Sequence, residues 1–179
     1  MENVFAKKRK EQGAFAWASL GDIKVGRGSL GEEMPVLVYR LMQYTMMDVL
    51  TRKYGEAACD DLFREAGLLA GREFARNVLK LDDDLDAFLA GLQKALVDLK
   101  IGILRMESLD AETGDMHLTV GEDLDCSGLP VTNENVCIYD EGFISGILET
   151  YTGKPYDVRE VDCWANGNRV CRFRCQTRR

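Results

Sequence analysis

Apolar residues recur at helical spacing in some segments and alternate with polar residues in others. Spacing of three or four residues predicts amphipathic helices over residues 34–54, 56–79, about 82–99 and 139–152. Strand-like runs of β-branched and apolar residues bounded by turn residues occur at residues 101–108, 116–120, 158–164 and 169–175. The chain is therefore predicted to combine four helices with four strands.

The first 33 residues differ from this pattern, because they are glycine-rich and lack a helical period. We expect residues 1–33 to form an N-terminal arm and residues 34–179 to form one domain, since no repeat or linker interrupts them. Phe15, Trp17 and Leu20 are too apolar for a freely solvated tail, so they are expected to pack on the domain or on a second subunit.

Composition narrows the class of protein. The 179 residues carry a net charge of −7, which argues against nonspecific nucleic-acid binding, since such binding requires positive charge. The run Lys7–Lys10 is the one basic exception and is interpreted as a solvated terminus. No apolar run reaches the roughly 18 residues of a membrane helix, and no secretory signal is evident. We therefore expect a cytoplasmic protein that does not enter a membrane.

Four of the six cysteines lie between Cys137 and Cys175. In a reducing compartment such clusters are more often metal sites than disulfides. A three-residue hairpin loop at 166–168 would place Cys163 opposite Cys171, close enough for both thiolates to bind one zinc ion. A two-residue loop would offset them, a cross-strand disulfide is the rival interpretation, and Cys126 or Cys175 remains an alternative ligand. Cys59, far from the others, is expected to be a lone thiol.

Two pairs of glycines four residues apart interrupt predicted helices. Gly67 and Gly71 fall in the second helix, and Gly142 and Gly146 fall in the fourth. Glycine is unfavourable in a helix interior, so the spacing indicates a place where another helix or a ligand approaches closely. Close helix packing is the favoured interpretation.

The second half of the chain resembles the 4-vinyl reductase domain family. The resemblance covers about residues 122–175. It is carried by Cys126-Ser127-Gly128-Leu129-Pro130, Cys137, Gly142-Phe143-Ile144-Ser145-Gly146, Glu160-x-x-Cys163, Gly167 and Cys171-Arg172-Phe173. It implies an α+β fold with helices packed on an antiparallel sheet, similar to vesicle-tethering subunits and nitric-oxide-sensing haem domains.

The family includes the sensory domains of phenol-responsive activators. Their zinc ligands match Cys137, Glu160, Cys163 and Cys171, so the resemblance implies a structural zinc ion on these four residues. On an ideal strand Glu160 and Cys163 face opposite ways, so the resemblance also implies a bend at Glu160. It further implies a homodimer.

The favoured function is a zinc-stabilised sensor or carrier of a small apolar or aromatic molecule. Its pocket is expected between the helices and the sheet, with candidate lining residues Tyr44, Met46, Phe74, Phe88, Phe143 and Trp164. One alternative is an enzyme or accessory protein in tetrapyrrole or hydrocarbon metabolism. It ranks lower, because no acid–base pair, nucleophile–base pair or cofactor motif is evident. The other alternative is a ligand-free dimeric scaffold.

Overall fold

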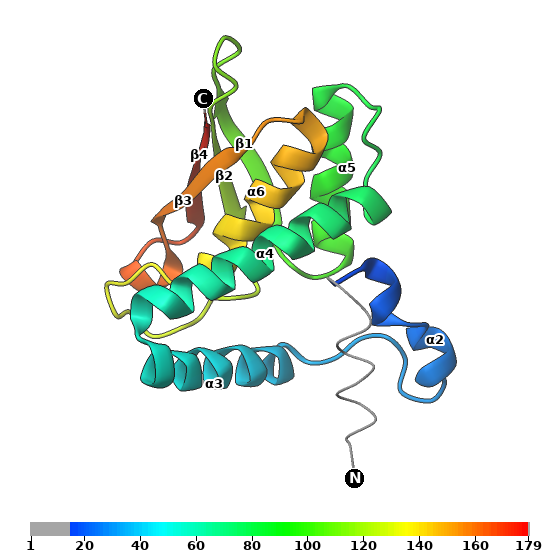
Figure 1. Cartoon of the computed structure of the whole chain (residues 1–179), viewed down its shortest axis with the longest axis vertical. Helices are drawn as coiled ribbons and strands as arrows, with labels where there is room; N and C mark the ends of the chain where they lie inside the picture. The colour runs from blue at the N-terminus through cyan, green and yellow to red at the C-terminus, as the bar shows by residue number, and fades with distance from the viewer. Residues whose placement is uncertain (1–14, 179) are drawn as a thin grey trace. The chain divides into compact units, whose positions relative to one another are not determined.

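The computed structural model describes residues 15–178, which divide into two units between Met34 and Pro35 (Figure 1). The first unit contains the 3-10 helix η1 (Trp17–Leu20) and the single turn α2 (Ile23–Gly26). Asp22 caps α2 by accepting a hydrogen bond from the Val25 N–H at 3.1 Å. Residues 1–14 of the predicted arm, including Lys7–Lys10, lie outside the described residues.

Four long helices form in the second unit, at the positions that the apolar spacing predicts. Their bounds are α3 (Val36–Tyr54), α4 (Glu56–Val78), α5 (Leu85–Asp98) and α6 (Ile138–Thr152). Asp84 caps α5 by accepting from the Ala87 N–H at 2.9 Å, which places a carboxylate at the positive end of the helix dipole. Gly55, with φ +86°, separates α3 from α4.

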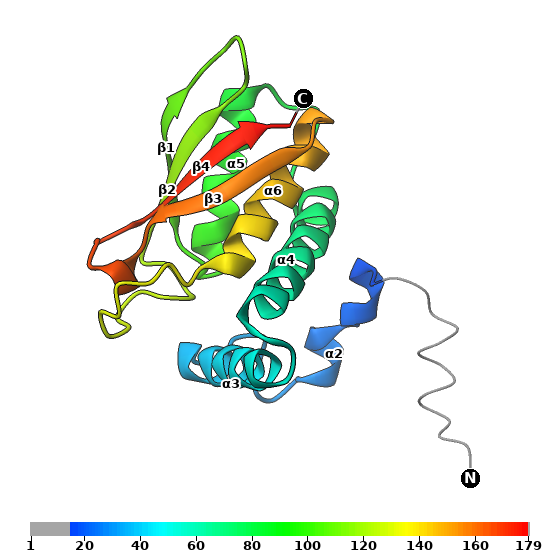
Figure 2. The same ribbon diagram turned by 60° about the vertical axis from the view of Figure 1, so that its left-hand side comes forward.

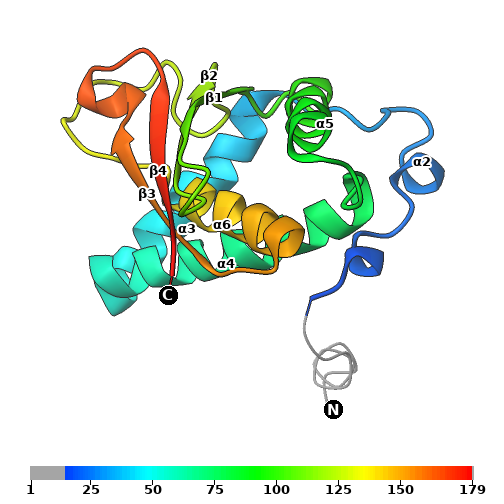
Figure 3. The same ribbon diagram turned by 90° about the horizontal axis from the view of Figure 1, so that it is seen from above.

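Four antiparallel strands form one sheet in the order β1-β2-β4-β3. The strands are β1 (Ile103–Leu109), β2 (Met116–Gly121), β3 (Tyr156–Asp162) and β4 (Cys171–Thr177). Helix α6 packs between β3 and α4, while α5 packs against β1 (Figures 2 and 3). The predicted α+β fold, with helices packed on an antiparallel sheet, is confirmed.

The core lies between the sheet and the inner helices. Its largest fully buried side chains come from α5, α6, β2 and β4, namely Phe88, Leu118, Ile147, Leu148 and Phe173. Alternating residues of β4 point inward, as expected for a sheet with one covered face.

Both edge strands of the sheet, β1 and β3, contain an irregularity. The register of β1 shifts between Met106 and Ser108, and that of β3 shifts between Glu160 and Asp162. The bend at Glu160 that the resemblance implied therefore coincides with an observed bulge. Because a bulge inserts one residue, it changes which side chains share a face.

The predicted tight hairpin between the last two strands is wrong in detail. Strand β3 ends at Asp162, and β4 begins only at Cys171. Between them the Cys163 carbonyl accepts the N–H groups of Asn166 and Asn168, which closes the short 3-10 helix η2 (Trp164–Asn166). Gly167 follows with φ +98°, so the Asn-Gly signal marks the end of η2 rather than a hairpin turn.

Helices α4 and α6 meet almost backbone to backbone at the four glycines noted in the sequence. A methyl group added at Gly142 would overlap the Arg64 carbonyl and lie 2.8 Å from the Leu68 nitrogen, and one at Gly67 would lie 2.9 Å from the Phe143 nitrogen. The interpretation of these glycines as close helix packing is confirmed.

Helix α3 buries fewer residues than the other three long helices do. Gln43 is its only buried residue, whereas Leu37 is 74% exposed and Leu41 is 63% exposed.

Helices within residues 15–178 all fall short of the length and apolar content needed to cross a membrane.

We predict that Gly142→Ala lowers the free energy of unfolding by about 3 kcal/mol, because the backbone of α4 cannot yield to the added methyl group without separating the helices. Gly91→Ala is the control, since nothing lies within 4 Å of that position. There alanine should raise stability by up to about 1 kcal/mol through helix propensity. Urea unfolding of both variants measures the contrast, and equal effects would contradict the packing argument.

Candidate metal centre and neighbouring cavities

Four cysteines from separate parts of the chain bring their sulfur atoms together. Cys126 lies in the loop after β2, Cys137 immediately precedes α6, Cys163 follows β3, and Cys171 begins β4. All four are buried, and their Sγ atoms lie within 4.8 Å of one another. The bulge in β3, between Glu160 and Asp162, lies just before Cys163.

The spacing of the sulfurs suits a tetrahedral metal ion. Zn–S bonds of about 2.3 Å imply sulfur–sulfur distances of about 3.8 Å. Cys137 Sγ lies 3.9 Å from Cys163 Sγ and 3.7 Å from Cys171 Sγ. Cys126 Sγ lies 3.0 Å from Cys171 Sγ, so this pair would open by about 0.8 Å around the ion.

The charge of the cluster also favours a cation. Hydrogen bonds from the thiols of Cys126, Cys137 and Cys171 lower the pKa of Cys163. In turn, interactions with the neighbouring sulfurs, that of Cys126 first, raise the pKa of Cys137 and of Cys171. Neighbouring thiolates raise one another's pKa, so further deprotonation requires a compensating positive charge such as a metal ion.

Glu160 lies beside this cluster rather than among the four mutually close donors. Its Oε2 accepts a hydrogen bond from the Cys137 N–H at 3.1 Å. Its Oε1 is buried and has no hydrogen-bond partner among the described residues. Burial, followed by the charge of Cys163, raises the pKa of Glu160 to about 8. The carboxylate is therefore close enough to support Cys137 and retains one free oxygen.

The remaining two cysteines lie apart from the cluster. Cys175 Sγ donates weakly to the Phe173 carbonyl at 3.9 Å. Cys59, on α4, contacts the Met47 carbonyl at 3.6 Å. The sequence left Cys126 and Cys175 as alternatives to the ligands that the resemblance implied, and of these two the structure brings only Cys126 to the other three sulfurs.

The loop that carries Cys126 is built on buried carboxylates. Asp123 accepts the N–H groups of Asp125 and Cys126 at 2.8 and 3.3 Å. Burial, with the charge of Asp125 second, raises the pKa of Asp123 to about 7. Burial also raises the pKa of Asp140, on α6, and its carboxyl group hydrogen-bonds to that of Asp123. Asp123 and Asp140 therefore form a carboxyl pair next to the thiols.

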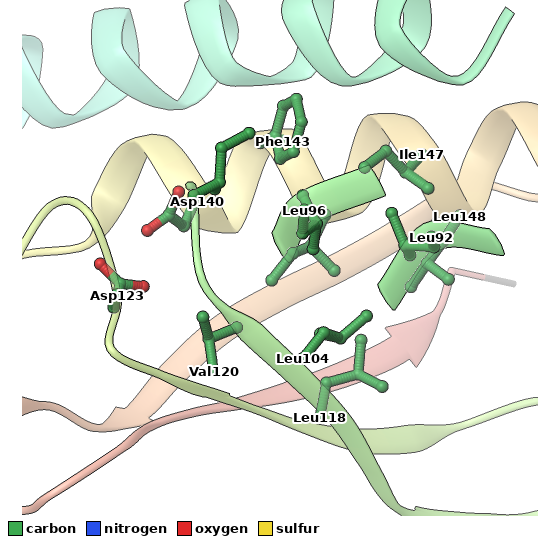
Figure 4. A pocket seen from close by; sticks show the side chains of 12 residues that line it. Leu92, Leu96, Leu104, Leu118, Val120, Asp123, Asp140, Phe143, Ile147 and Leu148 are labelled. Atoms are coloured by element: carbon green, nitrogen blue, oxygen red, sulfur yellow. The ribbon is translucent and has the colours of Figure 1, made fainter. Parts of the chain in front are cut away.

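This carboxyl pair closes one end of an apolar cavity between α5, α6 and the sheet (Figure 4). The cavity measures about 30 Å³, which exceeds the 10–15 Å³ that one water molecule needs and is far below the roughly 150 Å³ of a cavity known to bind benzene. The lining residues are Leu92, Leu96, Ile101, Leu104, Leu118, Val120, Asp123, Asp140, Phe143, Ile144, Ile147 and Leu148.

The six pocket residues expected from the sequence are dispersed. Phe143 lines the inner cavity, and Met46 lines a separate groove between α3 and α4. Phe74 packs on Phe143 with ring centroids 5.2 Å apart, and Phe88 stacks on Tyr151 at 3.8 Å.

The other two of the six make polar contacts. The Tyr44 hydroxyl donates to the Asp125 carbonyl at 3.0 Å, and Trp164 Nε1 donates to the Leu129 carbonyl at 3.1 Å. The cavity is instead bounded mainly by aliphatic residues that, in sequence, are indistinguishable from ordinary core.

Comparison with known proteins assigns the part of the chain that holds these residues. The family model of the V4R domain matches residues 116–177. This is the 4-vinyl reductase domain that the second half of the sequence resembles. Residues 116–177 thus match the V4R domain family. All four clustered cysteines and the whole of α6 lie in the matched range.

Two Methanocaldococcus jannaschii proteins are similar to most of the chain. MJ0150 is 27% identical over 145 residues, covering 81% of this chain and 77% of that protein. MJ1642 is 25% identical over 145 residues, covering 80% and 78%. The similarity thus extends beyond the V4R domain into the preceding helices.

Solved structures share the fold at low identity. The phenol-responsive sensory domain of the transcription activator PoxR with phenol gives a TM-score of 0.63 at 14% identity, covering 82% of this chain and 76% of that one. A vinyl-4-reductase family protein from Methanocaldococcus jannaschii gives 0.59 at 14%, covering 100% and 98%.

The two wider fold relatives expected from the sequence are also found. A trafficking protein particle complex subunit 3 from Naegleria fowleri, covalently bound to palmitic acid, gives 0.62 at 11% identity, covering 80% and 95%. An H-NOX protein from S. oneidensis gives 0.51 at 12%, covering 76% and 74%. The fold relationship predicted for the V4R domain is therefore confirmed.

Glu141 is a residue of this region that the sequence did not single out. Its buried carboxylate pairs with Arg64 at 2.9 Å and Arg159 at 3.0 Å, and its Oε1 accepts the Glu160 N–H at 2.9 Å. It thereby ties α4 and α6 to β3 at the residue next to the bulge. Three charges so far apart in sequence left no pattern to recognise.

We predict that Glu141→Gln lowers the free energy of unfolding by about 2 kcal/mol, because it removes the buried carboxylate that Arg64 and Arg159 share and leaves each arginine only a more exposed partner, Asp61 or Asp157. Asp61→Asn is the control, since Asp61 also pairs with Arg64, at 3.2 Å, but is exposed. That change should cost less than about 1 kcal/mol. Chemical unfolding compares the two, and a cost for Glu141→Gln no larger than the control would contradict this role.

Proposed function

We propose that this chain is a zinc-stabilised V4R domain that binds a small apolar or aromatic molecule as a sensor or carrier. The observation that carries the proposal is a buried set of four thiols directly beside an apolar cavity closed by a carboxyl pair. The similarity to the phenol-responsive domain of PoxR supports the same conclusion.

We assign the metal a structural role. Cys137, Cys163 and Cys171 are the three ligands on which the sequence resemblance and the sulfur geometry agree. For the fourth position the resemblance favours Glu160, whereas the distances favour Cys126. In a four-thiolate site Glu160 would act through its hydrogen bond to the Cys137 N–H. Either set closes the coordination sphere and stabilises the junction of the loop, α6 and the last two strands.

We place the ligand in the inner cavity of the V4R domain. The apolar walls suit a hydrocarbon or an aromatic ring, and the carboxyl pair offers acceptors for a hydroxyl group. Because the cavity measures about 30 Å³, a ligand the size of phenol requires the surrounding leucines to separate. Such widening would link occupancy of the cavity to the positions of α5 and α6, as a sensor requires.

We also propose a homodimer, the assembly that the sequence resemblance implies. Exposed apolar residues of α3 such as Leu37 and Leu41 support an interface there, because contiguous apolar surface is costly to leave in water.

We predict about one zinc ion per chain in the purified protein, measured by elemental analysis, because the four thiols form one tetrahedral site. Cys163→Ser should abolish stoichiometric zinc and lower the melting temperature, whereas Cys175→Ser, equally buried but outside the cluster, should retain it. Zinc-free wild-type protein with reduced thiols would contradict the proposal.

The fourth ligand is tested in the same experiment by Cys126→Ser and Glu160→Gln. If Cys126 binds the metal, its loss should weaken zinc binding more than the 10- to 100-fold expected for an outer residue, and Glu160→Gln should stay within that range. Cobalt substitution gives a second measurement, since four thiolates and three thiolates with one oxygen differ in their visible absorption.

We predict that phenol, toluene or a related aromatic raises the melting temperature by about 5 °C at 100-fold excess over the dissociation constant. Val120→Leu adds one methylene to the cavity wall and should remove the response. Val161→Leu, on an exposed residue of β3, should preserve it. The cavity assignment fails if the aromatics shift neither the wild type nor the enlarged variant Leu96→Ala.

A further inference from the structure

A second concave site lies between α3 and α4, and it shares no lining residue with the inner cavity. It measures about 450 Å³, within the range of small-molecule sites. We propose that this groove binds a small apolar molecule that carries one hydrogen-bond donor. Its lining residues are Tyr39, Met42, Gln43, Met46, Leu50, Leu62, Phe63, Ala66 and Tyr139.

The groove exists because α3 is held by hydrogen bonds rather than by close apolar packing. The Tyr39 hydroxyl and Gln43 Nε2 both donate to the Asp125 carboxylate, each at 2.8 Å. Arg40 donates to the carbonyls of Leu124 and Ser127 at 2.8 and 2.9 Å. These bonds fix one side of α3 on the loop that carries Cys126, and the groove opens between α3 and α4.

The groove walls are apolar and adaptable. Met42 and Met46 of α3 are 58% and 51% exposed, and Leu62 of α4 is 45% exposed. Methionine side chains adjust to irregular ligands, since they are unbranched and polarisable. A molecule in the groove would remove much of this apolar surface from water, which gives it a hydrophobic driving force.

Gln43 supplies the polar element. It is the most deeply buried of the lining residues, with 6% of its surface exposed. Its amide nitrogen is used on Asp125, while its Oε1 has no hydrogen-bond partner among residues 15–178. A buried acceptor without a partner is unfavourable. A ligand that brings an N–H or O–H group to Gln43 Oε1 would gain a hydrogen bond, and the side chain must shift to admit it because this oxygen has almost no exposed surface.

A second copy of the chain fits the groove less well than a small molecule does. Leu37 and Leu41, two highly exposed apolar residues of α3, do not line it, so a subunit packed on them would cover α3 without filling the groove. The groove's size and its single unsatisfied acceptor match a ligand with one donor instead.

The experiment uses N-phenyl-1-naphthylamine, a neutral apolar fluorophore with one N–H donor. We expect saturable binding of about one molecule per chain in the protein as purified, seen as a rise in fluorescence. Ala66→Phe and Met46→Glu should each weaken binding about ten-fold or more, since one fills the groove and the other puts a charge into it. Val49→Glu, on an exposed residue of the same helix that does not line the groove, should bind as the wild type does.

The hydrogen bond has its own measurement. The N-methyl derivative of the probe lacks the donor and should bind the wild type about three- to ten-fold more weakly than the parent probe does. In Gln43→Met this ratio should fall to about one, whatever the change in absolute affinity. Circular dichroism verifies that each variant is folded, and Met42→Glu replaces any groove variant that is not.

Three results would overturn the proposal. The first is the absence of saturable binding. The second is loss of binding in Val120→Leu but not in Met46→Glu, which would place the probe in the inner cavity. The third is equal loss in Leu41→Glu and Met46→Glu together with conversion of a dimer to a monomer by light scattering, which would make a second copy the occupant. None of these results depends on whether zinc or an aromatic binds elsewhere.

Discussion

The central electrostatic constraint of this structure is a cluster of four buried sulfur atoms that all lie within 4.8 Å of one another. A thiol that loses its proton there needs compensation, because burial disfavours charge and neighbouring thiolates repel one another. A metal ion bound at the cluster would remove this conflict, because its positive charge would stabilise the thiolates. Four parts of the chain meet at this cluster of sulfurs, namely the loop after β2, the start of α6, the end of β3 and the start of β4.

The elements of the fold could be predicted from local patterns. Helical spacing identified α3 to α6, alternation identified the four strands, and the glycine pairs identified the contact between α4 and α6 correctly. The hairpin failed because the Asn-Gly pair at residues 166–167 is equally compatible with a helical turn. That choice depends on the Cys163 carbonyl, whose surroundings are set by tertiary structure.

The candidate site was only partly predictable. The family resemblance grouped Cys137, Cys163 and Cys171 with Glu160, whereas spacing alone left Cys126 as one alternative. The position of Cys126 depends on the path of an irregular loop held by Asp123. The ion pairs of Glu141 and the aliphatic lining of the inner cavity left no local signal, since long-range contacts determine both. Large aromatic residues were a poor guide to the cavity, because most of them fill the core or cap a loop.

The two bulges in the sheet have a consequence for association. Strands β1 and β3 are the edges of the sheet, and each contains a register shift. A long regular edge strand exposes unpaired N–H and C=O groups that can pair with a strand of another molecule, and a bulge disrupts this pairing. This domain is thereby protected against edge-to-edge polymerisation, and a productive assembly between copies would have to use a helical surface instead of extending the sheet.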